Sequence, residues 1–533
     1  MIRAKTFVPI IAAVLVIAIA VGYLLVFRVF EVKPIETSTP TVSPTPTVIY
    51  KSIDVLKVSQ RADLSTIDVH VATDAPTLAV LSHVYETLFK IKFDESGRAS
   101  FVPHLVENYR QINETVWEFK LRPNVKFHDG GYLTSRDVKA SFERGPRVGG
   151  LPRILLGTVK AVEIVDDFTF RLILKYPFAP IIAHLAHPST AIIPAWVAEK
   201  FPNVTIDDVK YIVGTGPYKF VEFKKLERTV LEAFDEYWGE KPTVKRIEWI
   251  PVPDDSTRIA YLEAGTVDVA THIPPHMVTT LKAKGFNIVQ IPSTRIIYIG
   301  INVERINDIR VRQAMNFAVD KNSIVKAILE GAGSIATAPI PPAVFGYTKL
   351  EPYTYDVDKA RQLIREAGWE GREILFITPQ GRYLRDREIA DAVRAYLEQI
   401  GLRVKVEVME WASYIQRVTT QKDFDIFLLG WSTVTLDADY GLYSLFRAGA
   451  PFNRMQYNNT RVNELLDKAR VESDPQKRLQ LYAEAQRIIW EEAPWIFLHY
   501  EDIIVASKQG LVGLEIQPIE RWIFTYVKLV ASS

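Results

Sequence analysis

Two polar segments in the second half of the chain contain side chains suited to binding a charged ligand. The first, residues 378–385 (TPQGRYLR), contains Arg382 and Tyr383 directly before a predicted helix. A guanidinium beside the free N–H groups and positive dipole of a helix N-terminus favours a carboxylate or another anion. The alternative interpretation is that Arg382 is an ordinary solvated surface arginine.

The second segment, residues 430–440 (GWSTVTLDADY), combines an aromatic ring with acidic side chains. Trp431 offers a flat apolar platform, and Asp437 and Asp439 offer negative charge. The same two aspartates could instead form Asx-turns or cap the helix that follows, which is the common role of aspartate in a loop.

These segments follow predicted strands of an α/β arrangement. Residues 373–377 have the composition of a strand, residues 386–400 carry apolar side chains at helical spacing before Gly401, and Arg403–Met409 alternates polar and apolar residues. This is a β–α–β unit, whose strands should be parallel. Residues 424–429 are nearly all apolar, as in a strand covered on both faces. Because ligands bind outside the carboxyl ends of such strands, both segments are candidate binding loops.

The flanking sequence predicts a larger architecture. Long amphipathic helices are predicted over residues 309–330 and from the Asp474-Pro475 cap to Pro494. The first half is richer in short strands, such as that of Trp117, Phe119 and Leu121, and residues 134–137 (TSRD) indicate a capping box. We therefore predict an α/β fold with two lobes and an inserted strand-rich subdomain.

Composition excludes several classes of function. The 533 residues include 64 Lys and Arg against 63 Asp and Glu, a net charge of +1, so no overall field attracts nucleic acid. Absence of cysteine excludes thiolate zinc sites, iron–sulfur clusters and thiol nucleophiles. His272 and His276 enclose Pro274 and Pro275, which excludes the helical zinc pair of metalloproteases. With neither a phosphate loop nor a G-x-S-x-G elbow, we expect no cofactor, no metal and no nucleic-acid partner.

The N-terminus predicts an exterior location. After a cytoplasmic stub of residues 1–6, residues 7–27 form an apolar run long enough to span a bilayer, and Arg3 and Lys5 orient its start towards the cytoplasm. Residues 28–50 read as a stalk, because Pro, Ser and Thr make up 11 of the 14 residues from 34 to 47. A cleavable signal peptide ending at the 18–20 (AIA) site is the alternative. The domain should then lie at the outer face of the cytoplasmic membrane, at the cell surface or in the periplasm.

Short motifs across the exterior part resemble one protein family. The chain is similar to the family 5 extracellular solute-binding proteins, the dipeptide, oligopeptide, glutathione and nickel receptors of ABC importers, and its loops are closest to the dipeptide/glutathione branch. The motifs that carry the resemblance are residues 85–88 (YETL), 119–130 (FKLRPNVKFHDG), 137–142 (DVKASF), 214–218 (GTGPY), 237–239 (YWG), 265–268 (GTVD), 311–314 (VRQA), 366–368 (EAG), 381–383 (GRY), 430–431 (GW) and 437–439 (DAD).

The resemblance implies a two-lobed, periplasmic-binding-protein-like clamshell, type II and cluster C-like. Lobe I should comprise residues 51–95, 205–293 and 503–533, with the subdomain 96–204 inserted, and lobe II residues 294–502. A monomer would close on a small-molecule or peptide ligand and deliver it to ABC permease subunits driven by a cytoplasmic ATPase.

The resemblance also suggests roles for individual residues. In dipeptide receptors the arginine matching Arg382 is associated with the ligand carboxylate. Those receptors hold the peptide amine with an aspartate three residues after the Gly-Trp tryptophan, a position occupied here by Val434. Because valine cannot offset the desolvation of an ammonium group, either Asp437 or Asp439 supplies the charge or the ligand lacks a free amine there.

Three functions therefore remain open alongside peptide binding. Oligosaccharides are also ligands in this family, and they would use the aromatic rings of Trp411, Trp431 and Tyr443. From another class, a membrane-anchored exterior hydrolase could use Asp437 and Asp439, although residues two apart on an extended loop point away from each other. A ligand sensor that signals to a membrane partner is the third alternative.

Anchoring is directly testable. Because residues 7–27 can span the bilayer, we expect the mature protein to sediment with membranes and to resist extraction by high salt. Mass spectrometry of the mature protein should find the original N-terminal segment. A mature N-terminus near Val21 would instead establish signal-peptide cleavage.

Overall fold

The computed structural model describes residues 50–94 and 97–530, and the largest sheet within them has eleven strands. Ten strands follow one another across the sheet and β14 (Gly333–Ile335) pairs with one of them. In spatial order the ten are β16 (Arg403–Met409), β15 (Glu373–Pro379), β17 (Ile426–Ser432), β13 (Asn287–Ile301), β18 (Trp495–Ser507), β12 (Val269–Thr271), β2 (Ile53–Gln60), β11 (Val244–Pro251), β10 (Arg228–Ala233) and β9 (Tyr218–Lys224).

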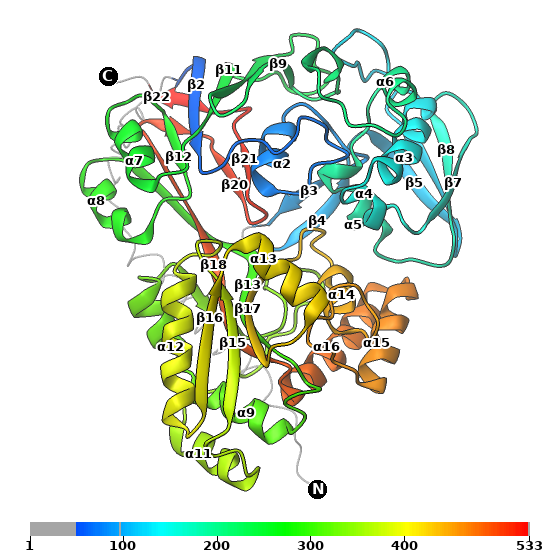
Figure 1. Cartoon of the computed structure of the whole chain (residues 1–533). Helices are drawn as coiled ribbons and strands as arrows, with labels where there is room; N and C mark the ends of the chain where they lie inside the picture. Colours follow the sequence, from blue (N-terminus) through cyan, green and yellow to red (C-terminus); the bar gives the residue numbers. More distant parts are fainter. Residues whose placement is uncertain (1–49, 95–96, 531–533) are drawn as a thin grey trace, which may run out of the picture. The chain divides into compact units, whose positions relative to one another are not determined.

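The long antiparallel strands β13 and β18 join the two halves of this sheet (Figure 1). One end of β13 pairs with β17, and β18 pairs with β12 near its C-terminal end. Between Pro292 and Ile296 the ladder slips, so that residues 293–295 of β13 lie opposite Glu501 alone. Bulges of this kind redirect a side chain out of its expected alternation, and here the redirected residue is Arg295.

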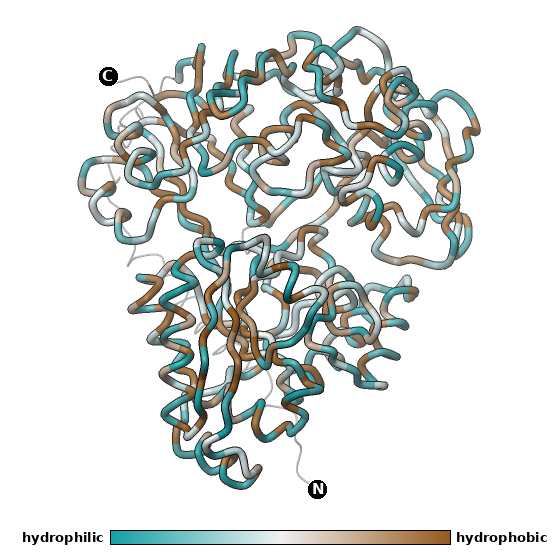
Figure 2. Tube along the Cα trace, viewed as in Figure 1, coloured by the Kyte–Doolittle hydropathy of each residue, from teal (hydrophilic) through white to brown (hydrophobic). Residues whose placement is uncertain are grey.

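The predicted β–α–β unit is confirmed. Strands β15 and β16 are parallel, and α12 (Asp386–Gln399) connects them and packs against both. Strand β17 is parallel to β15 on its other side, so the two predicted binding loops leave neighbouring carboxyl ends. Figure 2 shows hydrophobic residues along these strands and mixed hydropathy along α11 (Val357–Glu366) and α12, as amphipathic covering helices require.

The prediction of one helix over residues 309–330 is wrong. Helix α9 (Ile309–Ala318) stops at Val319, whose backbone is extended, and α10 (Lys321–Ser323) begins a new segment that continues as a π-helix to Ile328. The Asp320 side chain accepts a hydrogen bond from the backbone N–H of Ser323. Aspartate caps a helix end more favourably than it fills a helix interior, which explains the break.

A four-stranded antiparallel sheet lies apart from the main one. Its order is β5 (Val106–Asn113), β6 (Val116–Leu121), β8 (Thr169–Leu174) and β7 (Val159–Ile164). Helix α3 (Ser135–Val148) begins with the predicted capping box of Thr134 and Asp137, and Asp474 caps α16 (Pro475–Glu492) as predicted. Strand β6 alternates as expected, with Phe119 and Leu121 buried.

Shorter elements complete the described chain. The remaining helices are α2 (Ala75–Leu81), α4 (Pro152–Leu155), α5 (Ile181–Leu185), α6 (Ala195–Lys200), α7 (Asp255–Glu263), α8 (Val278–Ala283), α13 (Trp411–Gln416), α14 (Ser444–Phe446) and α15 (Thr460–Val471). The remaining strands are β1 (Tyr50–Lys51), β3 (Phe89–Phe93), β4 (Ala99–Pro103), β19 (Leu511–Val512), β20 (Glu515–Gln517), β21 (Arg521–Ile523) and β22 (Lys528–Val530).

Hydrophobic side chains gather in separate cores. The first core draws residues from 53–85, 191–269 and 503–527, and the second core lies within 296–500. A third core belongs mainly to residues 88–213 and a fourth, small one surrounds α7 and α8. The lobe boundaries expected near residues 293 and 502 fall inside β13 and β18, the strands that pass from one core to the other.

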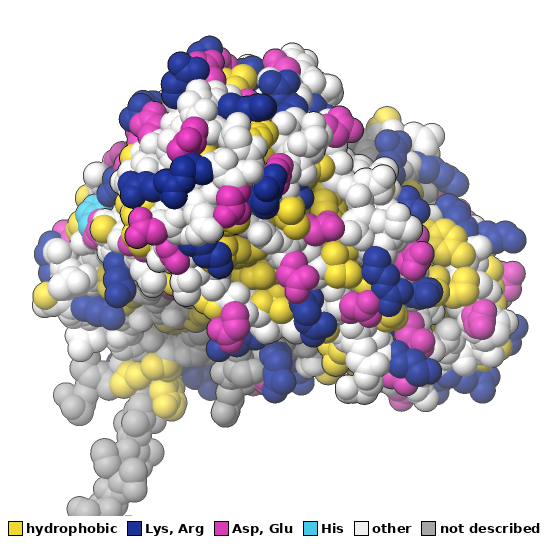
Figure 3. All heavy atoms as spheres, turned by 90° about the horizontal axis from the view of Figure 1, so that it is seen from below, with side chains coloured by type: hydrophobic (Ala, Val, Ile, Leu, Met, Phe, Trp, Pro, Cys, Tyr) yellow, Lys and Arg dark blue, Asp and Glu magenta, His cyan; other side chains and the backbone are white. Residues whose placement is uncertain are grey.

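The predicted anchor, stub and most of the stalk lie outside the described residues. Within residues 50–94 and 97–530, no helix combines the length and apolarity needed to cross a membrane. The face of the molecule in Figure 3 carries basic and acidic side chains intermingled, in keeping with the net charge of +1.

A buried ion pair ties α3 to the first core. The Arg144 guanidinium donates to the Asp68 carboxylate, with one nitrogen–oxygen distance of 3.1 Å, and both side chains are only 1% exposed. Asp68 also accepts a hydrogen bond from the backbone N–H of Ile206. Burial alone would raise the pKa of the Asp68 carboxyl, but Arg144 outweighs burial and holds that pKa below its usual 3.8.

Removing one partner of this ion pair should lower the stability of the protein. We expect Arg144→Met to lower the free energy of unfolding by about 3–5 kcal/mol, because it leaves a buried carboxylate unpaired. Arg136→Met on the same helix removes an exposed pair with Glu199 and should cost at most about 1 kcal/mol. Urea denaturation of both variants measures the difference.

The difference in unfolding free energy between Arg144→Met and the wild type should depend on pH. The folded pKa of Asp68 lies below its unfolded value, so the contribution of the pair is present above pH 3.8 and is lost as the pH falls further. Without Arg144, burial raises the pKa of the Asp68 carboxyl, so the variant takes up a proton there at higher pH than the wild type does. The stability gap between Arg144→Met and the wild type should therefore be largest near neutral pH and should begin to shrink above pH 3.8 as the pH falls. A gap that is constant with pH would contradict this assignment.

Candidate functional site

A cavity of about 630 Å³ lies where the binding loops leave β15 and β17. Its volume is typical of small-ligand sites. Both sides of the β13–β18 crossing contribute to its wall. The lining residues include residues 61–63 and Ser65 after β2, residues 73–76 and Leu78 around the start of α2, residues 272–275, Arg295, Gly381, Arg382, Leu384, Gly430, Ser432, Val434, residues 501–504 of β18 and residues 519–521.

Arg382 faces this cavity from a loop that is held by one buried carboxylate. The Asp386 side chain accepts hydrogen bonds from the backbone N–H groups of Gly381, Arg382 and Tyr383 at 2.8–3.1 Å. The guanidinium carbon of Arg382 lies 5.0 Å from the ring centre of Tyr383 and 5.2 Å from that of Trp411. Within the described residues no carboxylate lies within ion-pair distance of it, so its charge is open to a ligand.

Tyr383 and Trp411 support Arg382 from behind. Tyr383 is buried, its hydroxyl donates to the Gly430 carbonyl at 3.4 Å, and burial raises its pKa. Trp411 begins α13 and meets Tyr383 edge to face. Neither ring lines the cavity, so both act on a ligand through the arginine that they position.

Alternation along β17 decides which residues face the cavity. Gly430 and Ser432 line it, whereas Trp431 lies between them and points to the opposite side, where it stacks against Tyr440 and packs on Phe452. Val434 lines the cavity, so the position that holds an aspartate in dipeptide receptors presents an apolar side chain here.

Asp437 and Asp439 are bound by arginines of the second core. The Asp437 carboxylate accepts from Arg478 at 2.9 and 3.0 Å, and Asp439 pairs with Arg470 at 3.1 Å. Burial raises the pKa of the Asp439 carboxyl to about 6 in spite of that arginine. Tyr443 lies under the same Arg470, with 3.8 Å between guanidinium carbon and ring centre.

The predicted site residues thus separate into two groups. Arg382, Tyr383 and Trp411 come together at the cavity. Trp431 and Tyr443 are instead partly buried against the second core, and Asp437 and Asp439 are buried in pairs with arginines. A direct ligand contact by any of them stays a prediction.

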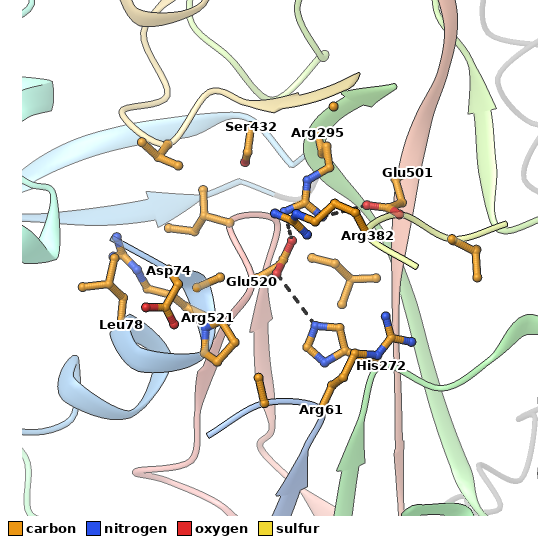
Figure 4. A pocket seen from close by; sticks show the side chains of 18 of the residues that line it. Arg61, Asp74, Leu78, His272, Arg295, Arg382, Ser432, Glu501, Glu520 and Arg521 are labelled. Carbon is orange, nitrogen blue, oxygen red and sulfur yellow. Dashed lines mark hydrogen bonds and ion pairs between the residues drawn. The ribbon is translucent and has the colours of Figure 1, made fainter. Parts of the chain in front are cut away.

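An ion-pair network that local sequence did not reveal crosses the cavity (Figure 4). Arg295 binds Glu501 at 2.8 Å and Glu520 at 2.7 Å, and Glu520 lies 3.8 Å from His272. Burial would raise the pKa of the Glu520 carboxyl, but Arg295, helped by His272 and Arg382, holds it well below its usual range. The only sign of this network in the sequence is Arg295 itself, the single charged residue within residues 287–301.

The arrangement is suited to binding charged groups. The described residues contain no cluster of three or more His, Asp or Glu side chains placed to hold a metal ion. The fixed charges and the enclosed volume fit a small polar ligand held by ion pairs and hydrogen bonds.

Comparison with known proteins identifies the family. The model of the bacterial extracellular solute-binding proteins, family 5, matches residues 100–453, more than half of the chain. The chain belongs to this family. Its members are the extracytoplasmic binding components of ABC importers, so this chain is a solute-binding protein of such an importer.

Family 5 relatives match over nearly their whole length. The glutathione-binding protein GsiB of Salmonella paratyphi A is 32% identical over 476 residues, which cover 86% of this chain and 92% of that protein. The periplasmic binding protein DppA from Helicobacter pylori, in complex with the peptide STSA, is 27% identical with a TM-score of 0.76, covering 90% and 99%. HbpA2 from Haemophilus parasuis is 28% identical with a TM-score of 0.79, covering 89% and 99%.

The glycine of the family-like Gly-Trp motif has a packing role that can be tested. A Cβ at Gly430 would lie 2.7 Å from the Tyr383 ring and 2.8 Å from the Ile297 side chain. Gly430→Ala should therefore push Tyr383 and the Arg382 loop outwards and lower the free energy of unfolding by about 1–3 kcal/mol.

Gly131→Ala is the matched control, because an added Cβ there meets only the Asp129 side chain at 3.3 Å in an exposed loop. Urea denaturation followed by tryptophan fluorescence measures both variants. Wild-type stability of Gly430→Ala would contradict the packing argument.

Proposed function

We propose that this family 5 protein captures short peptides outside the cell membrane and delivers them to the permease of an ABC importer. The observation that carries the proposal is the chemistry of the cavity wall. Within the described residues the wall has nine charged side chains and no Trp, Tyr or Phe; the nine are Arg61, Asp63, Asp74, Arg295, Arg382, Glu501, Asp502, Glu520 and Arg521. Such a wall suits a zwitterionic ligand.

Each end of a peptide has a candidate partner. Arg382 is free to bind the C-terminal carboxylate in a charge-assisted pair. Asp502 is a candidate for the ammonium group, because among the described residues its carboxylate accepts only from the neutral Gln290 amide and because burial raises its pKa. An ammonium ion beside it would satisfy that half-buried charge.

The relatives support a peptide ligand. GsiB is a glutathione-binding protein. The similar solved structures include DppA with the peptide STSA and the oligopeptide-binding protein AppA of Bacillus subtilis with a nonapeptide. The cavity of about 630 Å³ favours the shorter end of this range.

The alternatives fit the cavity less well. An oligosaccharide would use aromatic platforms, yet neither Trp431 nor Tyr443 lines the cavity, and both are partly buried against the second core. A hydrolase would need free carboxylates, whereas Asp437 and Asp439 are engaged by Arg478 and Arg470. Binding without catalysis is therefore the function that we propose.

We further propose how the chain would work at the membrane. Residues 7–27 would anchor it to the outer face of the cytoplasmic membrane, and residues 28–50 would hold the binding part above it. Lobes I and II, with the boundaries predicted from sequence, would close as a monomer about β13 and β18, a hinge motion that buries the ligand.

The test is calorimetric titration of the full-length chain with a panel of di- and tripeptides. Arg382→Ala should weaken binding roughly 30-fold or more, since losing one partner of a buried charge pair costs about 2–5 kcal/mol. Arg387→Ala, which removes an exposed arginine paired with Asp391 away from the cavity, should bind like the wild type.

Peptide amides provide the chemical control. An amidated C-terminus should weaken wild-type binding, and Arg382→Ala should lose little more with such a peptide. Mass spectrometry should recover every peptide intact. Tight binding of neutral oligosaccharides but of no peptide would replace this proposal, and turnover of the ligand would refute a receptor without catalysis.

A further inference from the structure

The four arginines of the cavity wall differ in their partners. Arg61 pairs with Asp255 at 3.3 Å, and Arg295 pairs with Glu501 and Glu520. Arg382 and Arg521 have no carboxylate within ion-pair distance among the described residues. Arg382 is accounted for by the proposed C-terminal carboxylate, so Arg521 is the cation without an assigned role.

A strained hairpin places Arg521 in the cavity. Strands β20 and β21 are joined by residues 518–520, and the backbone N–H of Glu520 donates to the Gln517 carbonyl at 3.1 Å. Glu520 has a φ of 57°, the left-handed conformation that such three-residue loops require and that usually selects glycine. A glutamate there costs backbone strain, and it brings two consecutive charged residues, Glu520 and Arg521, to the cavity wall.

The next residue fixes the hairpin. Trp522 is 1% exposed and packs edge to face on His272, with ring centres 5.6 Å apart. Helix α2 packs against β21 from the other side. Figure 4 shows Arg521 on the side of the cavity near Asp74 and Leu78, away from Arg382. The strand that carries Arg521 is therefore held in place by Trp522 and α2, which brings Arg521 to this part of the cavity wall.

The surroundings of Arg521 leave its charge uncompensated. Burial lowers its pKa to about 9, with no acidic side chain raising it again, whereas Glu520 and Glu501 more than reverse the same effect on Arg295. At neutral pH the guanidinium still carries its charge. Burial together with the Arg521 charge lowers the pKa of the neighbouring His187 well below its usual value, so that ring is neutral.

The acidic residues of the cavity wall do not supply the missing partner of Arg521. Asp63 accepts from the backbone N–H groups of Leu64 and Leu226, and Asp74 caps α2 by accepting from Thr77. Backbone donors satisfy the Asp63 carboxylate, and the Thr77 N–H and the Ser65 hydroxyl satisfy that of Asp74. The half-buried Arg521 guanidinium, without an acceptor among the described residues, favours an anionic group from outside the chain.

We propose that Arg521 binds a second anionic group of the ligand, so that the preferred substrates are peptides with two carboxylates. One carboxylate is the C-terminal group at Arg382, and the other belongs to an acidic side chain or a glutamyl end that reaches the opposite wall. This specificity rests on the peptide-binding function proposed above.

Matched peptides test it. Calorimetric titration of the full-length chain would compare Glu-Ala-Ala, Ala-Glu-Ala and Ala-Ala-Glu, each with its Gln counterpart. Wild-type protein should bind at least one Glu peptide about 10-fold or more tighter than its Gln counterpart. Arg521→Gln should abolish that preference while changing binding of the Gln peptide by less than about 3-fold.

Two further variants separate charge from structure. Arg387→Gln removes an exposed arginine that pairs with Asp391 away from the cavity, and it should keep the preference. Arg521→Lys keeps the charge and should retain part of the preference. Because the preference is measured first in the wild type, the proposal remains testable even if Arg521→Gln fails to fold.

The outcomes are distinct. Equal binding of Glu and Gln peptides by the wild type, or a preference that survives in Arg521→Gln, would overturn the role of Arg521 while leaving peptide binding intact. If no peptide of any pair binds, the proposed function itself fails, and the role of Arg521 fails with it.

Discussion

The antiparallel pairing of β13 with β18 is the constraint on which the binding cavity depends. These strands run through both halves of the main sheet, so each half must be built around them. The ladder slips where they cross, and the slip turns Arg295 into the cavity between Glu501 and Glu520. Because Glu520 comes from a hairpin of the first core, this single guanidinium connects the crossing strands to that core. Its charge also holds the pKa of the Glu520 carboxyl below its usual range.

Charge pairing separates structural arginines from those available to a ligand. Arg144 and Arg478 lie in the interior, where an unpaired charge is costly, and each has an aspartate. Arg382 and Arg521 are equally well positioned, one by Asp386 and aromatic rings and the other by Trp522, but the described chain provides neither with a carboxylate. Two arginines that have no ion-pair partner among the described residues and lie apart on the cavity wall are a more specific indication of the ligand than the size of the cavity.

Strand geometry explains why the two predicted loops contribute unequally. Both leave neighbouring parallel strands at the same edge, as expected. Along β17, however, successive side chains alternate, so the cavity receives Gly430 and Ser432 while Trp431 enters the second core. The absence of a side chain at Gly430 lets Tyr383 pack across the strand and hold Arg382. Gly430 and Trp431, neighbours in one motif, therefore face opposite sides of β17.

The sequence by itself determined many of the local elements and the two loops that border the cavity. Hydrophobic spacing predicted α12 and its flanking strands, Asp474-Pro475 predicted the start of α16, and Arg382 was recognisable before a helix N-terminus. It did not predict the break at Asp320, since capping competes with a periodic pattern that continues across it. Only the tertiary structure assigned Arg478 to Asp437 and brought Arg521 to the wall opposite Arg382, because such pairings join residues distant along the chain, where local spacing carries no information.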